Sequence, residues 1–454
     1  MNHTATVETG RPVSPVMNSG EDLALNLRQR NLLVAVKVLL LVSAPFWLWA
    51  LFFAGNYEFG TSLLFVPILW LFNISAIQHI TKSHPALRRV MLLGFTMKMA
   101  STGGYMAFQY VYYRNGMDAT TYYNIGKQWA TYYSTHGSYP IVGHLWGTSF
   151  LNLLSGVLVN ILGPSFPTIS ALFAAASFWG MYFFYDAFRS AFPNGRKEFC
   201  ALLLFFLPSC QFWTAALGKD ALMMLSIGMA SYGFTEVMAT RIARGTVFLV
   251  PAMTLGFFTR PHIAGMVAIA MLFPYTFALG KKGVAAAAAR VLGIPVMAAG
   301  VVYLVRNATK LLNVDSATGG LERIEKLGAA TTYGGSSFGQ GQSTAVRLLL
   351  SPFLMFRPFP WEIPNLLGVI ATAEALVLLY FLWQNRQELV GMLVSWRYHA
   401  FFTYAVTFGV LYSVVFSLAL SNFGLLIRQR TQYTPFLVIL AAASLSAARI
   451  RRSV

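Results

Sequence analysis

Long apolar runs that recur along almost the whole chain are the feature that most restricts its fold. Runs of this length cross a hydrocarbon core of about 30 Å as helices. Only 11% of the 454 residues are charged, whereas a soluble domain carries about 25% charge and could not cover its surface with so little. We therefore expect an all-α, polytopic transmembrane bundle of about twelve spans. The predicted spans are 32–54, 60–80, 91–113, 166–188, 199–216, 221–240, 246–259, 262–280, 285–305, 364–384, 399–420 and 431–447.

The basic residues between the runs predict the orientation of the helices. If the spans alternate from a cytoplasmic N-terminus, the short basic loops fall on one side, as the positive-inside rule requires. Both termini are then cytoplasmic. The net charge of +18 reflects this topology and does not indicate a nucleic-acid partner. The basic groups on the inner side are Arg88-Arg89, Arg196-Lys197, Arg241 with Arg244, Lys281-Lys282 and Arg451-Arg452.

The chain divides into five segments on this topology. The polar residues 1–31 form a disordered cytoplasmic tail, and residues 32–90 supply two N-terminal spans. A central module at 91–305 contains an outer loop at 114–165. Within that loop, residues 147–162 are apolar but short, and we interpret them as an interfacial or re-entrant helix. A long outer loop at 306–363 precedes the C-terminal spans and the short basic tail of 364–454.

Few residues suit metal or thiol chemistry. Cys200 and Cys210 lie ten residues apart on one predicted helix, about 15 Å from each other, which is too far for a disulfide. We expect them to be packing residues. No phosphate-binding loop, HExxH motif or Cys/His ligand set is present. Two charges, Lys98 and Glu374, lie inside spans, where charge is costly, and we expect them to form a buried pair.

The outer loops and helix ends contain charged residues at one predicted depth, near the outer membrane face. Cations there oppose the orientation rule, so the cluster suggests an anionic ligand in the outer leaflet. These residues are Asp118, Lys219, Asp220, Arg260, His262, Arg357, Glu362, Arg428 and Arg430.

Each of these residues also has a plainer interpretation. Asp118 opens a stretch rich in Tyr and Trp that includes Tyr122 and Tyr123. It is either a helix cap or a general base for a sugar hydroxyl. Asp220 can likewise cap its helix, with Lys219 as a solvated loop charge.

The remaining candidate residues can be interpreted in a similar way. Arg260 and His262 flank a proline and either bind phosphate or form a polar hairpin tip. Arg357, Trp361 and Glu362 lie between prolines that fix the local backbone. Arg428 and Arg430 either bind phosphate oxygens or snorkel at a helix end.

The arrangement resembles the polyprenyl-phosphate-sugar-dependent glycosyltransferases of the GT-C superfamily. Asp118, the Tyr-rich helix after it and the stretch 147–162 look like the acidic outer-loop module of that family. The blocks PSCQFWTAALGKD, RPH, FRPFPWE and NFGLLIRQR are similar to those of bacterial multi-pass proteins of envelope polysaccharide assembly. Two departures stand out. Here the acidic residue follows the third span instead of the first, and no second acidic residue lies beside it.

The resemblance implies an inverting transfer at the outer face of the bacterial inner membrane. A polyprenyl-phosphate-linked sugar is the donor, a glycan or lipid-linked molecule is the acceptor, and membrane lipids surround the protein. Asp118 would be the base. No nucleotide site is needed and no cofactor is assigned, and a divalent cation is left open. Donor phosphate would be bound by Lys219, Arg260, Arg357, Arg428 and Arg430, and the substrates by Tyr122, Tyr123, Asp220, His262, Trp361 and Glu362.

Two other functions remain open. An O-antigen-type repeat-unit polymerase or ligase also uses arginines against a lipid pyrophosphate, and the loop at 306–362 suits it. A lipid-linked glycan flippase or other transporter needs a polar path, for which only Lys98 and Glu374 are candidates. A thiol enzyme built on Cys210, Arg260 and His262 is a further alternative.

Overall fold

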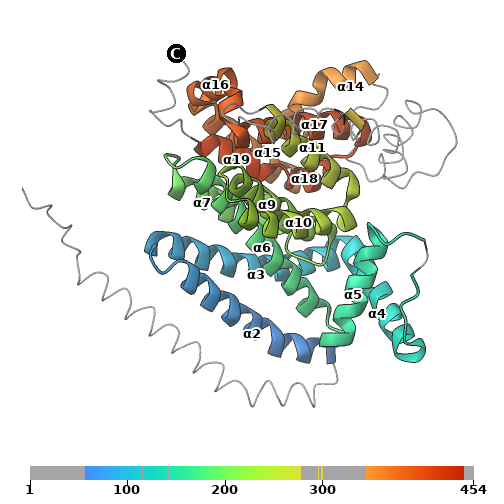
Figure 1. Cartoon of the computed structure of the whole chain (residues 1–454). Helices are drawn as coiled ribbons and strands as arrows, with labels where there is room; N and C mark the ends of the chain where they lie inside the picture. Colours follow the sequence, from blue (N-terminus) through green and yellow to red (C-terminus); the bar gives the residue numbers. More distant parts are fainter. Residues whose placement is uncertain are drawn as a thin grey trace, which may run out of the picture.

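The computed structural model describes residues 57–277 and 344–443, except 115, 142 and 364, together with positions 295, 298 and 299. All the secondary-structure elements in this part of the chain are helices (Figure 1), which confirms the all-α class. Several predicted segments lie outside the described part: the tail 1–31, the span 32–54, the span 285–305 apart from the three positions just named, residues 306–343 of the long loop and the final basic residues.

Six described helices are long and apolar enough to cross a membrane, which indicates a membrane-embedded protein. The other predicted spans do not meet both conditions or lie outside the described part. The six segments are Gly60–Ile80, Phe166–Ala191, Lys219–Met238, Ile242–Thr259, Leu366–Gln384 and Ala400–Ala419.

The described helices have the following order along the chain. The first part of the chain contains α2 (Tyr57–Ile80), α3 (Pro85–Tyr113), α4 (Asp118–His136), α5 (Thr148–Leu162), α6 (Phe166–Ala191), α7 (Lys197–Phe206), α8 (Pro208–Phe212), α9 (Lys219–Met238), α10 (Ile242–Thr259) and α11 (Pro261–Phe277). The second part contains α14 (Thr344–Leu350), η1 (Ser351–Phe356), η2 (Pro360–Glu362), α15 (Leu366–Gln384), α16 (Arg386–Val394), η3 (Trp396–Tyr398), α17 (Ala400–Ala419), α18 (Phe423–Arg430) and α19 (Thr434–Ala442).

Local sequence explains where several helices begin. Ser165 precedes α6, and its hydroxyl accepts a hydrogen bond from the Thr168 amide. Asn365 caps α15 in the same way, and Asn422 caps α18 by accepting from two amides. Such side chains satisfy the amides that a first helical turn leaves without partners.

The centre of the bundle depends on close contact between α6 and α9. A Cβ atom added to Gly228 would overlap the backbone carbonyl of Gly180. Small residues at helix interfaces allow backbones in a membrane to approach closely, because lipid provides little hydrophobic force for association. The outer helices α2, α10 and α15 instead expose large apolar side chains, including Phe72, Val247 and Leu366, as expected of surfaces that face lipid.

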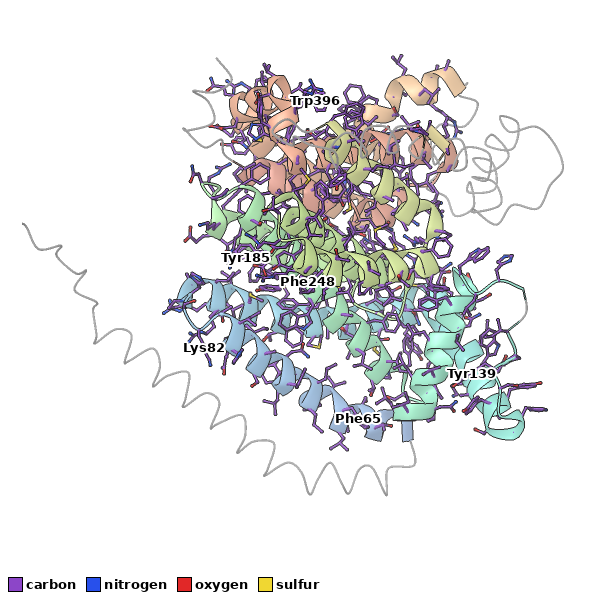
Figure 2. All side chains as sticks on the ribbon, in the orientation of Figure 1. Phe65, Lys82, Tyr139, Tyr185, Phe248 and Trp396 are labelled. Carbon is purple, nitrogen blue, oxygen red and sulfur yellow. The ribbon has the colours of Figure 1, made fainter. Side chains whose placement is uncertain are left out.

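The bundle has two distinct ends (Figure 2). Lys82 lies in the turn between α2 and α3 at one end, and Tyr139 follows α4 at the other. In Figure 1, α4 and α5 lie side by side at the right-hand end of the molecule. The stretch 147–162 is therefore a helix, as predicted, and it packs beside the Tyr-rich helix.

Two predicted spans are broken. The run 199–216 divides into α7 and α8 at Leu207, because Pro208 has no amide hydrogen with which to continue the helix. The run 431–447 starts with a turn after α18, and α19 begins only at Thr434. Apolarity alone therefore predicted continuous helices where the backbone is interrupted.

The predicted pair between Lys98 and Glu374 does not form. The ammonium group of Lys98 donates to the carbonyl oxygens of Cys210 (2.8 Å) and Gln211 (3.1 Å) at the end of α8. Glu374 accepts from the Ser209 amide at 2.9 Å, at the start of α8. Each charge thus lies at the end of α8 whose partial charge has the opposite sign. Cys200 and Cys210 are free and buried, as predicted.

Candidate functional site

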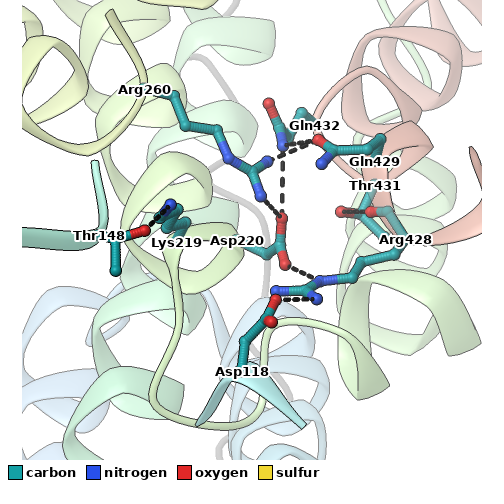
Figure 3. Close-up of polar contacts among 9 residues, drawn as sticks. All are labelled: Asp118, Thr148, Lys219, Asp220, Arg260, Arg428, Gln429, Thr431 and Gln432. Carbon is teal, nitrogen blue, oxygen red and sulfur yellow. Dashed lines mark hydrogen bonds and ion pairs between the residues drawn. The ribbon is translucent and has the colours of Figure 1, made fainter. Parts of the chain in front are cut away.

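A buried carboxylate, Asp220, is the centre of a polar cluster at the end of the bundle that includes α4 and α5 (Figure 3). Its side chain is only 2% exposed. The carboxylate pairs with Arg260 (Nη2–Oδ1, 2.9 Å), accepts from the Nε of Arg428 and lies 3.4 Å from the amide nitrogen of Gln432. These partners come from the α10–α11 connection, from α18 and from the turn after α18.

The helix-cap interpretation of Asp220 is wrong. The residue at the N-cap position of α9 is Gly218, and no side chain caps this helix. The carboxylate points instead between two guanidinium groups. A carboxylate buried in this way costs free energy unless cations and hydrogen-bond donors surround it, and both are present.

Arg428 joins this buried carboxylate to a second, exposed one. Its Nη1 donates to Oδ2 of Asp118 at 2.7 Å. The Asp118 side chain is 56% exposed, whereas that of Arg428 is 14% exposed. Burial opposes the charge on Arg428, but Asp220 and Asp118 more than offset it and hold the pKa of its guanidinium above its ordinary value. Arg428 is therefore always a cation.

Asp118 does not cap α4 either. It is the first residue of the helix, Met117 holds the N-cap position, and no side-chain cap is formed. The plainer interpretation of this residue from sequence is therefore also wrong. Its carboxylate is more than half exposed and lies between the buried cluster and the outside of the bundle.

Lys219 is the third cation of the cluster. Its Nζ donates to Oγ1 of Thr148 at 2.9 Å and lies 5.7 Å from the ring centroid of Tyr122. Burial, followed by the charge of Asp118, raises the pKa of Tyr122 to about 12, so its hydroxyl stays protonated at neutral pH. Lys219 has no carboxylate partner among the described residues.

The charges of the cluster do not cancel. Three basic side chains, Lys219, Arg260 and Arg428, lie around two carboxylates, Asp118 and Asp220. One positive charge therefore has no counter-ion from this group of residues. In surroundings of low dielectric such a surplus attracts an anion strongly, and a phosphate group with several acceptor oxygens suits arginine and lysine donors.

Uncharged residues complete the cluster and were missed from the sequence, among them Gln429, Gln432 and Thr148. Gln429 accepts from Nη1 of Arg260 at 2.6 Å and also from the amide group of Gln432 at 3.0 Å. Amide and hydroxyl side chains are common in membrane helices, and only the folded contacts single these out.

The structure places the other predicted site residues outside this cluster. Arg357 pairs with Glu362, and Trp361 is 80% exposed and stacks on Phe359. Arg430 is 1% exposed and donates to the carbonyl oxygens of Arg357 and Ala371. The ring of His262 is partly buried and lies 6.4 Å from that of Phe416, and Tyr123 packs on Phe166.

Arg430 accordingly differs from Arg428 although both lie in the last turn of α18. Its guanidinium faces the inside of the bundle, 3.9 Å from Glu374. Two backbone carbonyls and a carboxylate already surround it. We therefore leave Arg430 out of the phosphate-binding set proposed below.

The described residues contain no group of three His, Cys, Asp or Glu side chains placed to hold a metal ion. No family model matches the chain, and neither do any curated protein or solved structure.

Proposed function

We propose that the protein is a membrane glycosyltransferase that moves a sugar from a polyprenyl-phosphate donor to a glycan or lipid-linked acceptor. One observation supports this function above others. The exposed carboxylate Asp118 is joined by Arg428 to a cluster with surplus positive charge, at one end of an apolar helical bundle. A base and an anion-binding group thus lie side by side.

The proposed chemistry uses these two groups in one step. The acceptor hydroxyl loses its proton to Asp118 as its oxygen bonds to the anomeric carbon of the donor. The bond between that carbon and the phosphate oxygen breaks, and the lipid phosphate leaves with the electron pair. Attack from the face opposite the leaving group inverts the anomeric centre.

The cations stabilise the charge that develops on the departing phosphate. Arg428 and Lys219 are the candidates, since Arg260 is occupied by Asp220 and Gln429. Stabilisation of developing charge by fixed donors is often the largest catalytic contribution, and exclusion of water increases it. The apolar helices would accept the polyprenyl chain alongside them in the bilayer.

Mass spectrometry of a deletion strain tests this function. We would compare lipid-linked intermediates and surface glycans in the deletion strain with those in a strain that carries the wild-type chain. Loss of one sugar from the glycan, with accumulation of its lipid-linked donor, is the expected result, and the missing mass identifies the sugar.

The same measurement separates the competing functions. Accumulation of complete repeat units that remain unpolymerised would instead indicate a polymerase or ligase. Accumulation of the same lipid-linked glycan in a form that an impermeant labelling reagent does not modify on intact cells would indicate a flippase. An unchanged glycan and unchanged intermediates would contradict all three.

A further inference from the structure

Arg428 holds two carboxylates that differ sharply in burial. Asp220, on its Nε side, is 2% exposed and has Arg260 as a second partner. Asp118, on its Nη1 side, is 56% exposed, and Arg428 is its one ion-pair partner among the described residues. The inner contact is therefore fixed by the fold, whereas the outer contact is open to exchange with groups from outside.

We propose that Asp118 occupies the place of the substrate phosphate on Arg428, and that an incoming lipid phosphate displaces it. This exchange presupposes the transferase function proposed above. The ligand is a phosphate ester on an isoprenoid chain. Asp118 accepts from Nη1 of Arg428 through one oxygen, and a phosphate oxygen can accept from the same group, so one can replace the other without movement of Arg428.

The exchange links donor binding to activation of the base. While Asp118 is paired with Arg428, its Oδ2 accepts a charge-assisted hydrogen bond from Nη1 of that arginine and is turned toward the guanidinium. When phosphate takes the Nη1 group, the carboxylate is released next to the bound donor, where an acceptor hydroxyl must arrive. Asp118 thus becomes available as a base only when the lipid-linked sugar donor is bound.

The surplus charge of the cluster favours this replacement. Lys219 lies in the same cluster and has Thr148 and the ring of Tyr122 beside it, but no carboxylate partner among the described residues. A phosphate that contacts both Lys219 and Arg428 gains a second cation that Asp118 does not contact. Burial of Asp220 meanwhile keeps Arg428 in position throughout.

Removal of the Asp118 charge should therefore tighten phosphate binding while it abolishes transfer. Exposed ion pairs are weak, so we expect about two- to five-fold tighter binding for Asp118→Asn. Binding would be measured by calorimetry on the full chain in lipid nanodiscs, with farnesyl phosphate as the probe. Inorganic phosphate and farnesol serve as comparison ligands for the headgroup and the chain.

A matched control is available at the same end of the bundle. Glu58 forms an exposed ion pair with Lys127 at 2.8 Å and is 37% exposed. Glu58→Gln removes the same charge without any contact with Arg428 and should leave the affinity unchanged. In an Arg428→Gln background, Asp118→Asn should give no gain, because the competition for the guanidinium has been removed.

The outcomes separate the exchange from the function on which it depends. The exchange is supported if Asp118→Asn raises the affinity for farnesyl phosphate but not for farnesol, and if Glu58→Gln does not raise the affinity for farnesyl phosphate. If Asp118→Asn raises the affinity for inorganic phosphate by the same factor, the exchange is also supported and the effect is assigned to the phosphate headgroup. No gain, an equal gain with Glu58→Gln, or a gain that persists without Arg428 overturns the exchange and leaves the transferase function standing. Failure of the folded wild-type chain to bind farnesyl phosphate overturns both.

Discussion

Replacement of Asp220 by Asn should destabilise the protein far more than the same change at Asp118. Asp220 is 2% exposed and neutralises two arginines, whose side chains are 8% and 14% exposed. Its loss leaves Arg260 and Arg428 close together without a buried counter-ion. Breaking a buried ion pair from one side costs about 3–5 kcal/mol.

Asp118→Asn is the matched control, because the chemical change is identical and the residue contacts the same arginine. Asp118 is 56% exposed, so solvent screens the pair and the expected cost is below about 1 kcal/mol. Both variants would be unfolded with increasing SDS in mixed micelles and followed by Trp fluorescence, since the chain contains 10 Trp residues. A loss below about 1 kcal/mol for Asp220→Asn, or equal losses for both variants, would refute the central structural role given to Asp220.

Three further predictions concern the bundle around the site. Lys98→Met should lower the free energy of unfolding by about 1–3 kcal/mol, because the buried Gln211 carbonyl and Thr214 hydroxyl lose the donor that Lys98 supplies, and the same SDS titration measures this. Gly228→Leu should prevent close packing of α6 and α9 and remove most folded protein from the membrane, as size-exclusion chromatography in detergent would show, whereas Gly103→Leu, with no atom within 4 Å of an added Cβ, should not. Cys210→Ser should leave transfer per folded molecule at the wild-type level, since the thiol is a packing group, and a loss of turnover would favour a thiol mechanism.

Much of the fold could be predicted, because the length of an apolar run and the capping residue at its start determine a helix from neighbouring sequence alone. The run predicted at 166–188 corresponds to α6, whose start is fixed by Ser165, and the run at 399–420 corresponds closely to α17. The breaks could not be predicted from apolarity, because α7 and α8 are apolar on both sides of Leu207. Proline at 208 was visible, but the charges that hold the short α8 come from α3 and α15, far away in the sequence.

The site was predictable in part for a similar reason. The predicted alternation of spans put Asp118, Asp220, Arg260 and Arg428 at one depth, and the structure places these four residues in one cluster. The pairing among them depends on side-chain direction and burial. Residues two apart in α18, Arg428 and Arg430, therefore looked equivalent although one reaches the cluster and the other faces the inside of the bundle.

The assignment of Asp118 as the base is tested most directly in the deletion strain. The strain would carry either Asp118→Asn or Glu58→Gln, at equal amounts of folded protein, and the lipid-linked donor and the surface glycan would be quantified together. The proposed mechanism predicts that Asp118→Asn accumulates the donor and lacks the sugar, as the deletion does, while Glu58→Gln restores both to wild-type levels. A wild-type glycan with Asp118→Asn would contradict it and leave Asp118 as an ion-pair partner of Arg428 without a role in proton transfer.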